Sequence, residues 1–168
     1  MVQAAILMVF PLCLAVAAIS DLLTMTIPNR VSAILFASFL IVAPLAGLSP
    51  QGIALHLMAG LVVFSVCFSL FAMNVMGGGD AKLLTAAAVW FGWNQALMLF
   101  VVYVGFIGGA VTLLVLMIRA RADTVMAMGI RLPDSLCSAK KIPYGVAIGI
   151  AGFLAFPNSP LVTAALGH

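Results

Sequence analysis

Residues 77–84 read GGGDAKLL, and the apolar run that follows them extends to Trp93. Asp80 therefore lies at the edge of a hydrophobic segment, and a second acid, Asp21, follows the first apolar run of the chain. A carboxylate is costly to place beside a membrane span, so an acid in that position indicates a functional site by default. The chain has only four acidic residues, all of them aspartate. Two of these acids at similar depth predict a pair that acts together.

The composition predicts an all-α integral membrane protein. Hydrophobic residues make up 65% of the 168-residue chain and charged residues only 7%, whereas a soluble domain carries about a quarter charged residues. The apolar runs are continuous, which favours helices over the alternating pattern of a membrane β-barrel. We expect a single polytopic domain over residues 1–168, with about six transmembrane helices of roughly 20 residues and no separate soluble domain.

The expected fourth helix is unusually short. From Asp80 to Trp93 it would extend about 20 Å, less than the hydrocarbon core of roughly 30 Å. Either the glycine loop before it lies below the membrane surface or the bilayer thins there, and both bring Asp80 towards membrane depth. Non-helical backbone at that depth is tolerated only against protein or a wet cavity, which predicts a polar cleft. The six apolar runs lie near residues 2–19, 31–48, 53–73, 81–93, 95–118 and 143–166.

The positive charges predict the orientation in the membrane. With six spans, all seven Lys and Arg residues fall on one side, at Arg30, at Lys82 and within 119–141. The hairpins at 49–52 and 92–95 carry no charge. The positive-inside rule makes the charged side cytoplasmic and places both termini outside. The net charge of +3 fits this topology, so we expect membrane lipids rather than nucleic acid as partners. The segment 119–141 is either an interfacial helix or a solvated loop.

Asp21 and Asp80 have the chemistry of an aspartic hydrolase pair. The six-helix arrangement places Asp21 at the cytoplasmic end of the first helix and Asp80 at the cytoplasmic start of the fourth. Two carboxylates close together share one proton, so one activates a water molecule while the other donates to the substrate carbonyl. Gly77, Gly78 and Gly79 permit a close approach of backbone. The local alternatives are an ordinary helix N-cap at Asp80 and a water-facing helix end at Asp21.

Three segments together resemble the type IV prepilin peptidase family, and most closely its short Flp/Tad-type members. The segments are residues 21–29 (DLLTMTIPN), residues 77–84 and residues 141–145 (KIPYG), and their order and spacing match over essentially the whole chain. The resemblance implies an aspartic endopeptidase of the bacterial inner membrane that cleaves the short leader of prepilins on the cytoplasmic side. It also implies that Asp21 and Asp80 are the catalytic residues, with the three glycines as the active-site loop.

The chain departs from the larger prepilin peptidases in its cysteines. Those proteins carry an N-terminal cytoplasmic region with paired C-x-x-C motifs, which is linked to N-methylation of the new pilin terminus. Here the cysteines are Cys13, Cys67 and Cys137, and no two form such a pair. We therefore expect peptidase activity without methyltransferase activity, no N-terminal methyltransferase or zinc region, no cofactor and no metal site.

Further residues near the two acids are candidates for supporting roles. Lys82 and Lys141 either extend their ammonium groups to the lipid headgroups or tune an aspartate by charge proximity. Pro28 and Asn29 either shape the turn into the second helix or line the cleft.

Other features predict structure rather than chemistry. Two pairs of glycines, Gly105 with Gly109 and Gly145 with Gly149, have the four-residue spacing that lets membrane helices pack closely. His56, in the outer part of the third helix, is expected to be a packed or interfacial histidine rather than a ligand.

Two other classes of function stay open. A small proton- or cation-coupled transporter or channel would carry paired acids at mid-membrane and inverted repeats, whereas this chain shows no internal repeat and its acids cluster on one side. A catalytically silent assembly factor for a pilus or secretion system is the other alternative, and nothing in the sequence favours it, because both aspartates are present. The sequence identifies neither the particular prepilin nor the oligomeric state.

Overall fold

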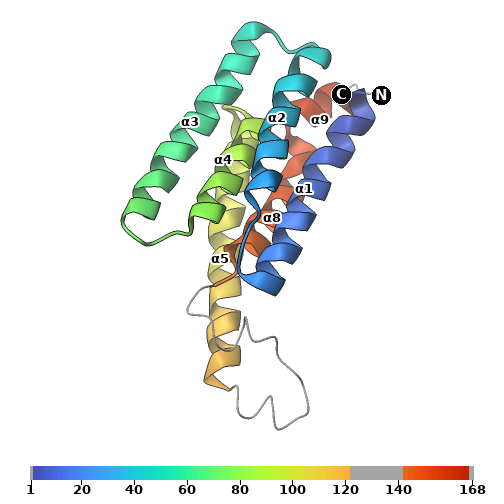
Figure 1. Ribbon diagram of the computed structural model, residues 1–168. Coiled ribbons are helices and arrows are strands. Elements are labelled where there is room, and N and C mark those ends of the chain that lie inside the picture. Colours follow the sequence, from blue (N-terminus) through green and yellow to red (C-terminus); the bar gives the residue numbers. More distant parts are fainter. Residues whose placement is uncertain (1, 122–141, 167–168) are drawn as a thin grey trace.

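The computed structural model describes residues 2–121 and 142–166, and every regular element within them is helical (Figure 1). Helices occupy all six predicted apolar runs, which confirms the all-α architecture. The helices are α1 Val2–Thr24, α2 Asn29–Leu45, α3 Pro50–Ala72, α4 Gly78–Phe91, α5 Gln95–Ala120, α8 Tyr144–Ala155, the 3₁₀ helix η1 Phe156–Asn158 and α9 Pro160–Leu166.

Three of these helices, α1, α3 and α5, are long and apolar enough to cross a membrane. The bent segment from α8 to α9 makes a fourth span if it counts as one. Helix α2 is shorter, at 17 residues, and α4 has 14, which corresponds to about 21 Å. Many large apolar side chains are exposed on the outer helix faces, such as Phe106 at 78%, as expected for side chains that contact lipid. The count of six crossings stays a prediction.

The last predicted helix, over residues 143–166, is broken, so the prediction of one continuous segment was wrong. The chain bends by 47° between Tyr144–Asn158 and Pro160–Leu166. Pro157 and Pro160 explain the break, because proline has no N–H to donate and its ring clashes with the preceding turn of a helix. Ser159, between them, is extended at φ −67° and ψ 137°.

Helix α4 lies in the middle of the bundle and packs against α3, α2 and α8 (Figure 1). From Leu83 to Phe91 every side chain except the half-buried Thr85 is buried, and Ala86, Ala87 and Ala88 are among them. Such small residues let neighbouring membrane helices approach closely. The short helix is therefore a core element surrounded by longer ones.

Buried hydrogen bonds hold the C-terminal end of α4. The indole Nε1–H of Trp90 donates to the Leu35 carbonyl of α2 at 2.8 Å. The hydroxyl of Ser159 donates to the Trp90 carbonyl at 2.9 Å. All three residues are buried. This end of α4 is thus tied both to α2 and to the break between α8 and α9.

His56 packs against the same end of α4 and confirms the prediction of a packed histidine. Its side chain is buried, and its Nδ1 lies 2.7 Å from the Val89 carbonyl oxygen. Its ring stacks on Phe39 with 5.2 Å between the ring centroids. Gly92, at φ 70°, leaves room for the ring, because a Cβ there would lie 2.6 Å from the histidine Nε2.

The glycines of α8 pack it against α1, as predicted. A Cβ at Gly149 would lie 3.0 Å from the Ala18 Cβ, and one at Gly145 would lie 2.8 Å from the Asp21 Cβ. The four-residue spacing therefore forms a seam between these helices, and this seam ends at Asp21.

The predicted packing role of Gly105 and Gly109 in α5 was wrong. Among the described residues, a Cβ at either position would meet no atom within 4 Å apart from the backbone of its own helix, and both glycines are exposed. Gly108 makes the close approach instead, since a Cβ there would lie 2.9 Å from the Tyr144 ring. In a membrane protein both the packed and the lipid-facing sides of a helix are apolar, so the spacing did not reveal which side packs.

The described cations lie towards one end of the bundle. Arg30 and Lys82 are in the first turns of α2 and α4, while Arg119 and Arg121 are at the end of α5. Both described chain ends lie at the opposite end of the bundle (Figure 1). Arg131, Lys140 and Lys141 lie outside the described residues.

Candidate active site

Asp21 lies in the last turn of α1 and is 5% exposed. The backbone N–H of Gly145, at the start of α8, donates to Asp21 Oδ2 at 2.6 Å. A hydrogen bond from a backbone N–H to a carboxylate is short and stronger than a neutral one. The alternative of a water-facing helix end at Asp21 was therefore wrong, because the carboxylate is buried and held by the start of another helix.

Position 145 needs a glycine because of Asp21. A Cβ there would lie 2.8 Å from both Cβ and Oδ2 of Asp21, and 2.9 Å from Cδ1 of Ile27. The final residue of the KIPYG segment thus gives the carboxylate its hydrogen-bond donor at close range. This contact explains why the KIPYG segment and Asp21 belong to one site although they lie more than a hundred residues apart in the sequence.

The loop after α1 is held by hydroxyl groups from the end of α1 and from the loop itself. Met25 takes the left-handed conformation, at φ 53°. Ser20 Oγ donates to the Thr26 carbonyl at 2.9 Å, and the hydroxyls of Thr24 and Thr26 are 2.7 Å apart. The loop therefore leaves α1 along a defined path and carries Ile27 into the bundle, where this side chain is buried.

Asp80 is the third residue of α4, and the N-cap residue is Gly77. The alternative of Asp80 as the N-cap was therefore wrong. Its half-buried side chain folds back over the start of its own helix, where a Cβ at Gly77 would lie 2.7 Å from Asp80 Oδ2. A carboxylate in the first turn is favoured by the positive end of the helix dipole.

The other two glycines bring the start of α4 close to its neighbours. A Cβ at Gly78 would lie 3.3 Å from the Phe71 ring of α3, and one at Gly79 would lie 3.2 Å from the Ile27 Cβ. Gly79 therefore packs on the loop that follows Asp21. Ile27 lies between Gly79 and Gly145, so the three segments singled out in the sequence meet at this side chain.

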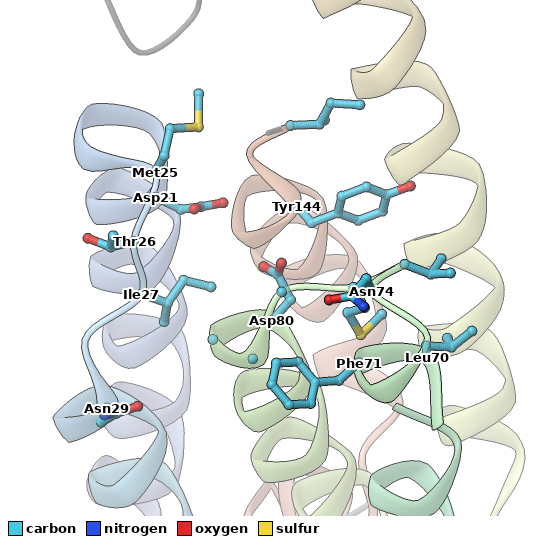
Figure 2. Close-up of a pocket in the computed structure, with 16 residues that line it drawn as sticks. Asp21, Met25, Thr26, Ile27, Asn29, Leu70, Phe71, Asn74, Asp80 and Tyr144 are labelled. Atoms are coloured by element: carbon cyan, nitrogen blue, oxygen red, sulfur yellow. The ribbon is translucent and has the colours of Figure 1, made fainter. Parts of the chain in front are cut away.

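A cavity of about 740 Å³ contains both acids. Figure 2 shows Asp21 and Asp80 on facing elements, α1 and α4, with Ile27 and Asn29 on the loop side. The wall is mixed: apolar side chains from α3 and its loop alternate with amide, hydroxyl and glycine groups. It is lined by Asp21, Met25, Thr26, Ile27, Asn29, Leu70, Phe71, Asn74, Val75, Met76, Gly77, Gly78, Gly79, Asp80, Ile142 and Tyr144.

The predicted supporting residues divide into three groups. Lys82 and Asn29 come together, since Lys82 Nζ donates to Asn29 Oδ1 at 2.9 Å and joins the starts of α4 and α2; Asn29 also lines the cavity. Pro28 is the N-cap residue of α2, at φ −62°, and lies outside the cavity lining. Lys141 lies outside the described residues.

Sequence reasoning missed Asn74 and Tyr144 as lining residues. Tyr144 belongs to the KIPYG segment, so its place beside Gly145 was a usable signal. No sequence signal marked Asn74, because it is a single polar residue between α3 and the glycines and belongs to none of the three segments. Within residues 2–121 and 142–166, no three His, Cys, Asp or Glu side chains come together as metal ligands.

These features define a class of protein: a helical membrane protein in which carboxylates from two separate helices line one cavity. The chain matches the type IV leader peptidase family over residues 8–113, and it belongs to that family. It is 31% identical over 140 residues to a prepilin leader peptidase/N-methyltransferase of Aeromonas salmonicida strain A449, and equally to a protein of the same name from Aeromonas salmonicida. The alignment covers 80% of this chain and 43% of each relative, so the chain spans less than half their length. No solved structure matches it.

Proposed function

We propose that this protein is a membrane aspartic endopeptidase that cleaves the leader peptide of Flp-type prepilins, with Asp21 and Asp80 as its catalytic pair. The observation that carries the proposal is that these two acids, 59 positions apart in the sequence, line the same cavity. Membership of the leader peptidase family supports the choice of reaction. The names of the Aeromonas relatives support a prepilin as the substrate.

The mechanism follows from two neighbouring carboxylates that share one proton. The ionised carboxylate takes a proton from a water molecule, whose oxygen attacks the scissile carbonyl carbon. The protonated carboxylic acid gives its proton to the carbonyl oxygen. The tetrahedral intermediate then breaks its C–N bond: the leaving amine takes up the proton that the first carboxylate accepted, and a hydroxyl of the intermediate returns its proton to the second carboxylate as the new C=O forms. Such a pair titrates as a unit rather than as two independent acids.

Several contacts prepare the pair for this chemistry. The Gly145 N–H holds one oxygen of Asp21, and Ile27 separates the start of α8 from the start of α4. Fixed catalytic groups need no reorganisation when the reaction occurs. The mixed wall of the cavity admits a polar peptide segment beside an apolar one, as a leader followed by a hydrophobic helix requires.

The proposed location is the bacterial inner membrane, with the cavity on the cytoplasmic side and both termini outside. The described cations lie towards the cavity end of the bundle, which supports this orientation through the positive-inside rule. In a variant that lacks the native cysteines, a cysteine at Gly47 should react with an impermeant maleimide in intact cells, and one at Arg121 only after permeabilisation. The opposite labelling pattern would invert the orientation.

The catalytic proposal is tested by co-expression with a candidate prepilin and mass measurement of the pilin N-terminus. The wild type should release the leader, whereas Asp21→Asn and Asp80→Asn should leave the prepilin whole although both variants insert normally. Thr112→Val is a control for insertion, because it changes a polar side chain of α5 outside the cavity lining, where the hydroxyl donates to the Gly108 carbonyl. Full processing by either aspartate variant would refute the mechanism.

A further inference from the structure

Asn74 follows α3 in a conformation that usually calls for glycine. Its φ is 58°. The Val75 N–H donates to the Leu70 carbonyl and the Asn74 N–H to the Phe71 carbonyl, both at 2.9 Å. This pair of bonds is the Schellman motif that ends many helices, and its left-handed position is most often glycine and sometimes asparagine. The backbone alone would therefore be served at least as well by glycine.

The side chain of Asn74 faces the cavity that holds the two acids. It is exposed there and lines the cavity together with Asp80. Figure 2 shows its amide directed into the cavity, on the same side as Asp80. Unlike Asn29 and Thr26, which bond Lys82 and Thr24, the Asn74 amide has no hydrogen-bond partner in the described part of the chain.

The backbone position of Asn74 relative to Asp80 is fixed on both sides. The two Schellman bonds hold the backbone of Asn74 to the last turn of α3. The packing of Gly78 on Phe71 then holds the start of α4 against that same turn, because a Cβ at Gly78 would lie 3.3 Å from the ring. Asn74 and Asp80 are thus presented to the cavity by one compact corner of the structure.

We propose that the Asn74 carboxamide binds the main chain of the substrate beside the scissile peptide bond. This inference rests on the proposed peptidase function and names a substrate-binding residue for it. A carboxamide carries both a donor and an acceptor, which match the C=O and N–H of one peptide group. A substrate segment that lies extended in the cavity makes no hydrogen bonds of its own, and at a membrane edge its polar groups need partners from the protein.

Two variants separate the amide from the backbone conformation. Asn74→Gly removes the amide and keeps, or relieves, the left-handed position. Asn74→Ala removes the amide and also strains the backbone. The purified full chain in detergent is assayed with a prepilin that the wild type processes, and thermal unfolding is followed on the same samples.

We expect Asn74→Gly to lower kcat/KM about tenfold, mainly through a higher KM, with an unchanged or raised thermal midpoint. Asn74→Ala should lose at least as much activity and unfold at a lower temperature. If Asn74→Gly cleaves as fast as the wild type and only Asn74→Ala is impaired, Asn74 is a helix cap and the inference is wrong.

The substrate provides a second check, because a contact with the main chain does not depend on side chains. The loss caused by Asn74→Gly should be equal for two prepilins that differ in the leader side chains next to the cleavage site. A loss with one prepilin and none with the other would contradict main-chain binding. If the wild type cleaves no prepilin, the proposed function fails and this inference falls with it, whereas cleavage unaffected by Asn74→Gly removes the inference alone.

Discussion

The two ends of α4 use their polar groups in opposite ways. At the C-terminal end, Trp90 and Ser159 are buried and make hydrogen bonds inside the bundle. At the N-terminal end, Asp80 and its glycines line a cavity of about 740 Å³. One end thus closes the core, while the other presents polar groups to whatever enters the cavity. The comparison suggests that a short helix, held firmly at one end, positions a reactive carboxylate at the other.

The largest effect in this comparison is expected at Gly145, which supports Asp21 across the cavity. Gly145→Ala would place a Cβ 2.8 Å from the Asp21 Cβ and Oδ2, so the carboxylate must move. A misplacement of about 1 Å costs about a hundredfold in rate, and we expect kcat/KM to fall by that much. The measurement is cleavage of a prepilin by the purified protein.

Gly109→Ala is the matched control for Gly145→Ala. It makes the same change in another membrane helix, at a position where a Cβ would meet no atom of a neighbouring element within 4 Å in the part of the chain that the structure describes. Cleavage should stay at the wild-type rate and the stability should not fall, since alanine is the better helix former. Equal activity of the two alanine variants would show that the Gly145 contact does not position Asp21.

The next effect is on stability and comes from the closed end of α4. Trp90→Phe removes the indole N–H that bonds the Leu35 carbonyl and leaves a gap in the core, which together cost about 2 kcal/mol. We expect a lower free energy of unfolding in a detergent titration, with kcat of the folded fraction unchanged. A loss of kcat without a loss of stability would reverse the roles assigned to the two ends.

The smallest effect is expected at Lys82, whose ammonium bonds the exposed amide of Asn29. An exposed contact of this kind contributes about 0–1 kcal/mol. Lys82→Met should therefore change kcat/KM by no more than about threefold, and Lys82→Arg by less. A loss as large as that of Gly145→Ala, recovered by Lys82→Arg, would instead favour the alternative that the charge tunes the aspartates.

The sequence predicted the helices well because long apolar runs have few other solutions in a membrane. It also predicted that the fourth helix is short and that Asp21 and Asp80 lie at the same end of the bundle, since charge placement and motif order are properties of the sequence itself. The break in the last helix was missed, although Pro157 and Pro160 marked the place. The apolar content of this segment predicts one membrane helix, whereas the backbone chemistry of its two prolines predicts a break.

The rest of the site depended on packing that no local pattern contains. The hydrogen bond from Gly145 to Asp21, the place of Ile27 between two glycines and the inward direction of Asn74 all join segments distant in sequence. The glycines of α5 show the opposite case, in which a local pattern predicted a packing contact that the structure does not have. Their spacing predicted a packed face, but the face that packs contains Gly108.

The central claim is that Asp80 serves chemistry and not the stability of the fold. It is tested most directly by measuring the initial cleavage rate and the thermal midpoint of purified Asp80→Asn beside the wild type. The account predicts no detectable cleavage and a thermal midpoint equal to or above that of the wild type, because the substitution removes one of two acids that share a cavity. Cleavage at the wild-type rate, or a loss of activity that merely follows unfolding, would contradict it.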